Sequence, residues 1–196
     1  MFKYLLIFVF FMTGCAHRHG FVGSIEDMIV RPFDENAEIP EKKFDPELKP
    51  YIDQFIKDAR TRGVNITPES QNMLVQFVYV DKFTNHEMNP ALLALCQRFY
   101  GYENLSTKAK KVRWNIIEVL KEQTALYTEG DKIRLKELLY HELFHCFMHK
   151  GHLPPGVPGI MAPVLNKGSE RIYTDWNGLV DEMFSPKYLE MIPDAN

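Results

Sequence analysis

Apolar residues recur at helical spacing in two stretches of the chain. In residues 47–62 they fall every three or four positions and stop before Gly63, which predicts an amphipathic helix. A second, longer pattern follows Thr128 and Asp131, either of which could cap a helix, and continues to Phe147. Because this second helix also contains a run of histidines, we expect it to carry the chemistry of the protein.

Other stretches are rich in β-branched and aromatic residues, as strands are. They cover residues 73–80, 92–100 and 112–119, and apolar and polar side chains alternate in the last of them. From residue 153 onward the chain is rich in Pro and Gly, with one short helix candidate at residues 176–184. Together these patterns predict an α+β domain with a loop-rich C-terminal part.

The beginning of the chain has the pattern of an export signal. Lys3 precedes an apolar run over residues 4–12, which is too short to span a bilayer. The run leads into the sequence MTGC, which ends at Cys15 and resembles the bacterial lipobox, where the cysteine is acylated and becomes the new N-terminus. Secretion with cleavage elsewhere is the alternative, although no better small-x-small site lies nearby. We expect residues 1–14 to be a lipoprotein signal peptide.

A lipid on Cys15 would anchor the protein stably in a membrane. Residues 15–46 mix Gly, Pro and charge with few clustered apolar residues, which suits a flexible tether. The folded domain is then expected over residues 47–196, a length that buries one core. The residue after the lipidated cysteine is Ala16 and not Asp, which favours sorting to the outer membrane if the host has one. The expected location is the bacterial cell envelope, with the domain facing the periplasm or the exterior.

The balance of charge excludes one class of partner. The formal net charge is -3, and the Lys and Arg residues are scattered among the acidic ones. No basic stripe forms, so we expect no nucleic-acid partner. If Cys15 is lipidated, Cys96 and Cys146 are left in a compartment that permits disulfides. A disulfide and two separate buried thiols are both compatible with the sequence.

The candidate chemistry lies in residues 141–152, HELFHCFMHKGH, which contain four of the seven histidines. The first five residues match HExxH. Residues four apart lie on one face of a helix, so His141 and His145 can both bind one Zn2+ at about 2.1 Å. Glu142 then lies beside the metal, where a carboxylate can act as general base for an attacking water.

A catalytic zinc site needs a third protein ligand. His149 continues the spacing of four, but eight residues of straight helix rise about 12 Å, too far for one ion. His152 could reach the metal if the helix ended near Met148 and the chain doubled back, a reversal that Gly151 would ease. A carboxylate is the alternative third ligand, from Glu170, Asp181 or Glu182.

Residues 141–152 resemble a group of bacterial lipoproteins predicted to be metallopeptidases, whose motif is HELGHC with a further histidine seven positions after the second. That group is similar to metzincins with one residue added between the second and third histidines. The resemblance implies His152 as third ligand and a metzincin-like fold, with a small twisted mixed sheet and an active-site helix. The sequence departs from the group at His149, usually Gly or Asn, and at Phe144, usually Gly.

Further downstream, residues 159–163, GIMAP, resemble the Met-turn, in which a methionine packs beneath the metal-binding imidazoles. Met161 takes that position. Some metzincins bring a tyrosine two residues later to the metal, but Pro163 stands there. Residues 92–119 resemble the region that leads into the edge strand, with which a substrate peptide pairs in this clan.

These observations predict a membrane-anchored zinc metalloendopeptidase that hydrolyses peptide bonds with zinc-activated water. Its partners would be a peptide or protein substrate and, through Cys15, a membrane. The alternative is a non-catalytic zinc-binding envelope lipoprotein that acts as a scaffold or binding module. Glu142 distinguishes the two, because a structural zinc site has no use for a carboxylate beside an open coordination position. A metal-free scaffold ranks last.

Overall fold

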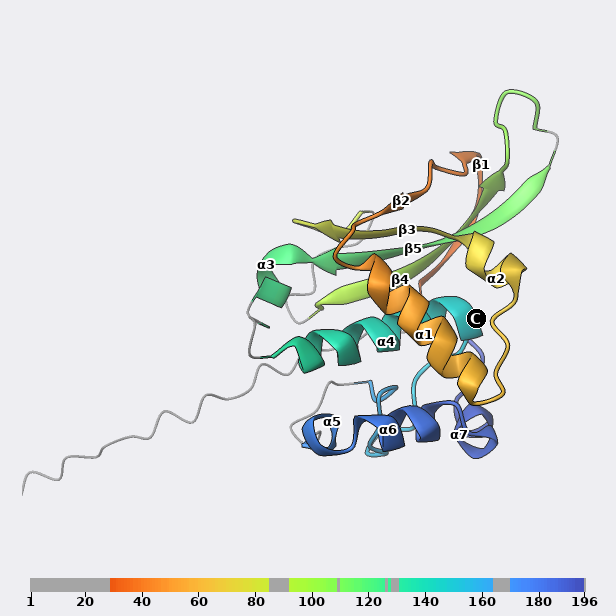
Figure 1. Cartoon of the computed structure of the whole chain (residues 1–196). Coiled ribbons are helices and arrows are strands. Elements are labelled where there is room, and N and C mark those ends of the chain that lie inside the picture. The colour runs from red at the N-terminus through yellow and green to blue at the C-terminus, as the bar shows by residue number, and fades with distance from the viewer. Residues whose placement is uncertain are drawn as a thin grey trace, which may run out of the picture.

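The structure is a computed structural model, and it describes residues 29–84, 92–108, 110–125, 127, 131–163 and 170–195 (Figure 1). The strands are β1 Ile29–Glu38, β2 Lys43–Phe44, β3 Leu74–Val80, β4 Ala94–Tyr102 and β5 Lys111–Leu120. The helices are α1 Lys49–Thr61, α2 Pro68–Met73, α3 Lys121–Ala125, α4 Lys132–Met148, α5 Arg171–Thr174, α6 Trp176–Met183 and α7 Pro186–Met191.

The strands form one mixed sheet in the order β1-β4-β5-β3-β2. Strands β2, β3 and β5 are parallel to one another, β4 is antiparallel to β5, and β1 is parallel to β4. The α+β class and the mixed sheet are confirmed. The predicted strands at 73–80, 92–100 and 112–119 correspond to β3, β4 and β5.

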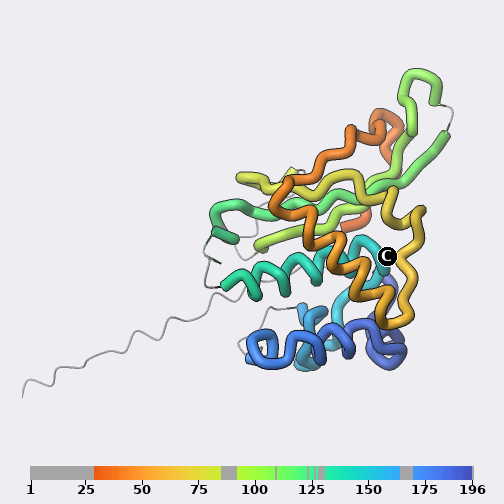
Figure 2. The backbone as a smooth tube through the Cα atoms, viewed as in Figure 1, coloured from red at the N-terminus to blue at the C-terminus, as the bar shows by residue number. Residues whose placement is uncertain are grey.

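Helices α1 and α4 lie on the same face of the sheet, and α5, α6 and α7 pack beyond α4 (Figures 1 and 2). The buried face of α1 contributes Ile52, Phe55 and Ala59, and the helix ends at Thr61, shortly before Gly63, whose φ of 79° suits glycine. Phe55 contacts the rings of Tyr140 and Phe184. The main core therefore joins the sheet, α1, α4 and the C-terminal helices.

The folded unit begins earlier than the sequence predicted. Residues 15–46 were expected to form a tether, but residues 29–44 contribute strands β1 and β2, one at each edge of the sheet. The sequence of β1, IVRPFDENAE, contains Pro32 and several charges, and most of the strand is exposed. A strand of this kind depends on its neighbour more than on its own pattern, so composition alone suggested a linker.

The C-terminal part is also more regular than expected. The predicted helix at 176–184 is confirmed as α6, whose first turn is capped by Asp175 accepting from the N–H of Gly178 at 3.1 Å. Helices α5 and α7, of four and six residues, were not predicted because neither is long enough to show a helical period. The signal peptide and Cys15 lie outside the described residues.

Candidate metal centre

Helix α4, which carries the HExxH motif, is buried along most of its length. Residues 137–147 are all buried, because the sheet, α1 and the C-terminal helices each cover one side of α4 (Figure 1). Tyr140, for example, contacts Phe55 of α1 and Trp176 of α6. The polar side chains of this stretch are therefore out of water and require partners.

The helix ends at Met148, as the third-ligand argument required. His149 is left-handed, with φ 58° and ψ 35°, and its N–H donates to the carbonyl oxygen of His145 at 3.1 Å. Beyond it, the N–H of Gly151 donates to the carbonyl oxygen of Pro193 at 2.7 Å. This reversal fixes the chain against the C-terminal segment and turns His152 back towards α4.

Three imidazoles meet as a result. The Nε2 atom of His141 lies 2.9 Å from Nε2 of His145 and 2.9 Å from Nε2 of His152. The Nε2 atoms of His145 and His152 are 3.2 Å apart. Nitrogen atoms this close can all lie about 2.1 Å from a single ion. In the described part of the chain, these three residues form the group that could hold a metal ion.

Main-chain carbonyl groups orient two of the rings. The Nδ1–H of His141 donates to the carbonyl oxygen of Ile160 at 2.6 Å, and the Nδ1–H of His145 donates to that of Lys150 at 2.6 Å. A carbonyl oxygen only accepts, so the proton of each neutral ring lies on Nδ1 and the lone pair on Nε2. Such contacts fix both the tautomer and the direction of a metal-binding imidazole.

These tautomers leave lone pairs facing one another across 2.9 Å between His141 and His145. A shared proton could relieve the repulsion, but burial lowers the pKa of His145 to about 3 and that of His141 well below its usual value. Both rings are therefore neutral near pH 7. A cation between the three nitrogens satisfies all the lone pairs, so the residues present fit a bound metal ion.

The environment of Glu142 also fits a bound metal ion. It is 1% exposed, and neither of its carboxylate oxygens has a hydrogen-bond partner among the described residues. Burial raises its pKa to about 8, and the nearby N–H of Cys96 opposes this shift without making a hydrogen bond of normal geometry. A buried carboxylate without partners is costly, so the pair of orphaned oxygens indicates a missing ligand beside them.

The segment predicted as a Met-turn lies beside this centre. Met161 is buried, and Ile160 supplies the carbonyl oxygen that holds His141. The N–H of Met161 donates to the hydroxyl of Tyr188 at 3.1 Å, and its carbonyl oxygen accepts from the N–H of Leu153 at 2.8 Å. The segment is thus tied to α7 on one side and to the chain next to His152 on the other.

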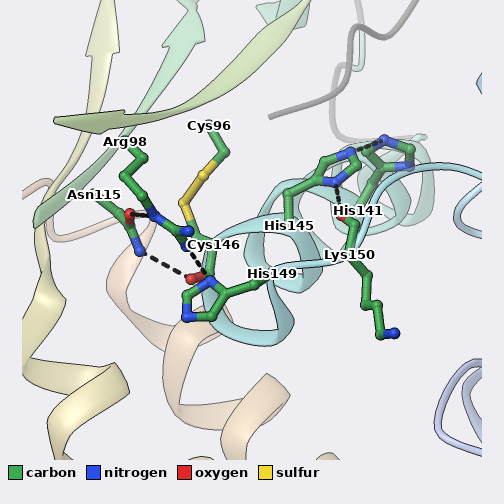
Figure 3. Close-up of a disulfide and its surroundings, with 8 residues drawn as sticks. All are labelled: Cys96, Arg98, Asn115, His141, His145, Cys146, His149 and Lys150. Carbon is green, nitrogen blue, oxygen red and sulfur yellow. Dashed lines mark hydrogen bonds between the residues drawn. A yellow bond between two sulfur atoms is a disulfide. The ribbon is translucent and has the colours of Figure 1, made fainter. Parts of the chain in front are cut away.

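A disulfide between Cys96 of β4 and Cys146 of α4 settles the question that the sequence left open (Figure 3). Its Cα atoms are 5.9 Å apart, and the residues it joins are 50 positions apart in the chain. Because Cys146 directly follows His145, the disulfide fixes the metal-binding turn of α4 to the sheet. The bond also places β4 next to the metal centre.

Buried Arg98 and Asn115 form a second polar cluster with the half-buried His149, which we call the helix-end network (Figure 3). Asn115 donates from Nδ2 to the carbonyl oxygen of Cys146 at 2.9 Å and accepts from Nε of Arg98 at 3.2 Å. A second guanidinium nitrogen of Arg98 contacts Nδ1 of His149. Figure 3 shows the His149 ring directed towards Arg98 and away from His141 and His145.

The remaining candidate ligands lie elsewhere. Asp181 makes an ion pair with Arg62 at 2.6 Å, and Glu182 makes one with Arg171 at 2.9 Å. Glu170 is exposed at the start of α5. None of the three belongs to the histidine group. The structure therefore brings together the three predicted histidines, buries Glu142 in the same helix, and separates His149 and the acidic candidates from the histidine group.

Comparisons with protein-family models, with curated proteins and with solved structures found no significant match to this chain. The described residues contain no helix that is both long enough and apolar enough to cross a membrane. Functional interpretation therefore rests on the geometry of the metal centre.

Sequence reasoning missed the groups that hold the ligands in place. The carbonyl oxygens of Ile160 and Lys150 gave no signal, because every residue has a main-chain carbonyl. Tyr188, which anchors the turn at Met161, lies in a helix too short to predict. Arg98 and Asn115 face each other across β4 and β5, so a correct strand register could have shown that they are neighbours.

Proposed function

We propose that the protein is a zinc metallopeptidase of the metzincin kind, in which His141, His145 and His152 hold Zn2+ and Glu142 is the general base. The observation that carries the proposal is a buried carboxylate, that of Glu142, which has no hydrogen-bond partner among the described residues and lies in the same helix as two of the three converging imidazoles. Neutral imidazoles in a set of three, with no fourth protein ligand among the described residues, suit a catalytic zinc site better than a structural one.

Zinc bound there would polarise a scissile carbonyl group and make water more acidic. Glu142 would accept the proton of the attacking water and pass it to the leaving amine. Its carboxylate must be ionised to do so, and any cation held on the histidines favours the ionised form. Neither oxygen of Glu142 has a hydrogen-bond partner among the described residues, so the carboxylate is available to accept that proton.

The rival function is a zinc-binding envelope lipoprotein that cleaves nothing. It explains the three histidines equally well, but it gives no reason to bury Glu142 without a partner at a cost in stability. We also propose, from the sequence of residues 1–15, that Cys15 carries the lipid anchor and that the domain works at the cell envelope.

Glu142→Gln distinguishes the two functions. Wild type and the variant are compared, each as the zinc-loaded full chain, by their cleavage of a mixed peptide library. A general base contributes about 10²–10⁴-fold to rate, so the variant should bind zinc as wild type does and lose cleavage by a factor in that range. Cleavage products from wild type that persist unchanged in Glu142→Gln would contradict the assigned role. Zinc binding without cleavage by wild type would favour the scaffold.

A further inference from the structure

The last described residues of the chain pair with the segment that follows α4. Residues 193–195, which we call the C-terminal clamp, form an antiparallel bridge with residues 149–151. Lys150 stands opposite Asp194 in this bridge, and their side chains make an ion pair at 2.7 Å. The side chain of Asp194 is 78% exposed, so this ion pair adds little to stability. The pairing therefore depends on main-chain groups.

Two main-chain hydrogen bonds join the segments. The N–H of Gly151 donates to the carbonyl oxygen of Pro193 at 2.7 Å. The N–H of Ala195 donates to the carbonyl oxygen of His149 at 2.9 Å. Gly151 is buried and Ala195 is half-buried, so water competes weakly for these bonds. They stand on either side of Lys150 and fix the orientation of its peptide groups.

The clamped segment lies between two of the metal ligands in the chain and bears on both. The carbonyl oxygen of Lys150 accepts from the Nδ1–H of His145 at 2.6 Å (Figure 3). Two residues later comes His152, whose Nε2 atom lies 2.9 Å from that of His141. A shift of the segment would therefore move the group that orients the second ligand, and it would move the third ligand itself.

The C-terminal clamp is itself anchored in the core. It directly follows Ile192, which is 1% exposed and belongs to the main core. Helix α7 precedes Ile192, and the hydroxyl of Tyr188 in that helix accepts from the N–H of Met161. The carbonyl oxygen of Met161 accepts in turn from the N–H of Leu153. Helix α7 and the clamp thus hold the chain both before and after the third ligand.

We propose that residues 193–195 are positioning residues of the metal centre, which keep the turn after α4 in its metal-binding geometry and so set the affinity for the ion. This inference rests on the three-histidine site of the proposed function. A turn that is held in place before the ion arrives loses less conformational freedom on binding. A turn that adopts the binding geometry for only a fraction of the time binds more weakly by that fraction.

The coupling between the clamp and the metal acts in both directions. If the paired clamp strengthens metal binding by some factor, bound metal must strengthen the pairing of the clamp by the same factor. The C-terminal clamp should therefore pair more tightly in the zinc-loaded protein than in the metal-free protein. A segment that only supports the fold would pair equally well in both forms.

The test is Ala195→Pro in the full chain, with zinc affinity measured by competition against a chromophoric chelator. Proline removes the N–H that donates to His149 and leaves every metal ligand in place. Loss of a group that orients metal ligands weakens metal binding about 10–100-fold, so the zinc affinity of Ala195→Pro should fall about tenfold or more. Asp194→Ala removes only the exposed ion pair and should change the affinity less than about twofold.

Asp175→Ala is the matched control for a general loss of stability. It removes the cap of α6, where Asp175 accepts from the N–H of Gly178. The midpoint of urea unfolding should fall in this variant while its zinc affinity stays unchanged. No loss of zinc affinity in Ala195→Pro, or an equal loss in Asp175→Ala, would overturn the role of the clamp.

Hydrogen exchange of the Ala195 amide in wild type decides the question if Ala195→Pro folds poorly. This amide should exchange about tenfold more slowly with bound zinc than without it, whereas the amide of Gly178 should exchange equally in both forms. Equal exchange of the Ala195 amide with and without zinc would overturn the inference. Wild-type protein that binds no zinc would instead overturn the three-histidine site, and the role of the clamp with it.

Discussion

Helix α4 carries two buried polar clusters that differ in how completely their atoms are paired. In the helix-end network, Arg98, Asn115 and His149 bond to one another and to the carbonyl oxygen of Cys146. In the metal centre, lone pairs of neutral imidazoles converge, and both oxygens of Glu142 lack a partner among the residues that the structure describes. A paired buried cluster indicates a structural role, whereas an unpaired one indicates a ligand.

The largest expected effect is on stability, because removal of metal affects the metal centre and leaves the helix-end network paired. A ligand present at a thousandfold excess over its Kd stabilises the folded state by about 4 kcal/mol. Adding a chelator to the zinc-loaded protein should therefore lower the free energy of unfolding by about that amount, measured by urea denaturation. His152→Ala should lose most of this response. An identical denaturation curve with and without chelator would show that the metal centre is empty in solution.

Asn115→Ala tests whether the helix-end network stabilises the fold. The substitution leaves a donor of Arg98 and the carbonyl oxygen of Cys146 without partners, so the free energy of unfolding should fall by about 2–4 kcal/mol. Asn72→Ala is a control, because its hydrogen bond from Lys42 is exposed, and it should change stability by less than about 0.5 kcal/mol. Equal losses of stability in Asn115→Ala and Asn72→Ala would contradict a structural role for the helix-end network.

Glu142→Met should stabilise the metal-free protein, whereas Asn115→Ala should destabilise it. It replaces an unpartnered buried carboxylate with an apolar side chain of similar size, so the free energy of unfolding should rise by about 1–2 kcal/mol. Glu137→Met is the matched control on the same helix, since Glu137 is equally buried but bonded to Arg134 at 3.3 Å. That substitution should destabilise the protein. A loss of stability in Glu142→Met would mean that Glu142 has a structural partner.

The parts of the structure that the sequence predicted are those that depend on residues close together in the chain. Helix α4 was expected from the helical spacing of its apolar residues and β5 from its alternation of apolar and polar residues. Strands β3 and β4 were expected from their β-branched and aromatic residues. The ligands His141, His145 and His152 followed from helical spacing and from the reversal near Gly151. Each of these features is local, so its residues are sufficient to indicate it.

Features that depend on distant neighbours could not be predicted. β1 is a strand because β4 offers it an edge, and its own sequence, interrupted by Pro32, resembles a linker. Cys96 and Cys146 pair because α4 packs on β4, which no spacing between them reveals. Their separation of 50 residues in the chain gave no estimate of their separation in space.

The most direct test of the metal centre is the zinc content and zinc affinity of the full chain in wild type, His152→Ala and His149→Ala. His152 belongs to the converging group, whereas His149 belongs to the helix-end network. We predict one equivalent of zinc in wild type, a sharp loss of affinity in His152→Ala and little change in His149→Ala. Wild-type protein that binds no zinc, or an equal loss in both variants, would contradict the three-histidine site.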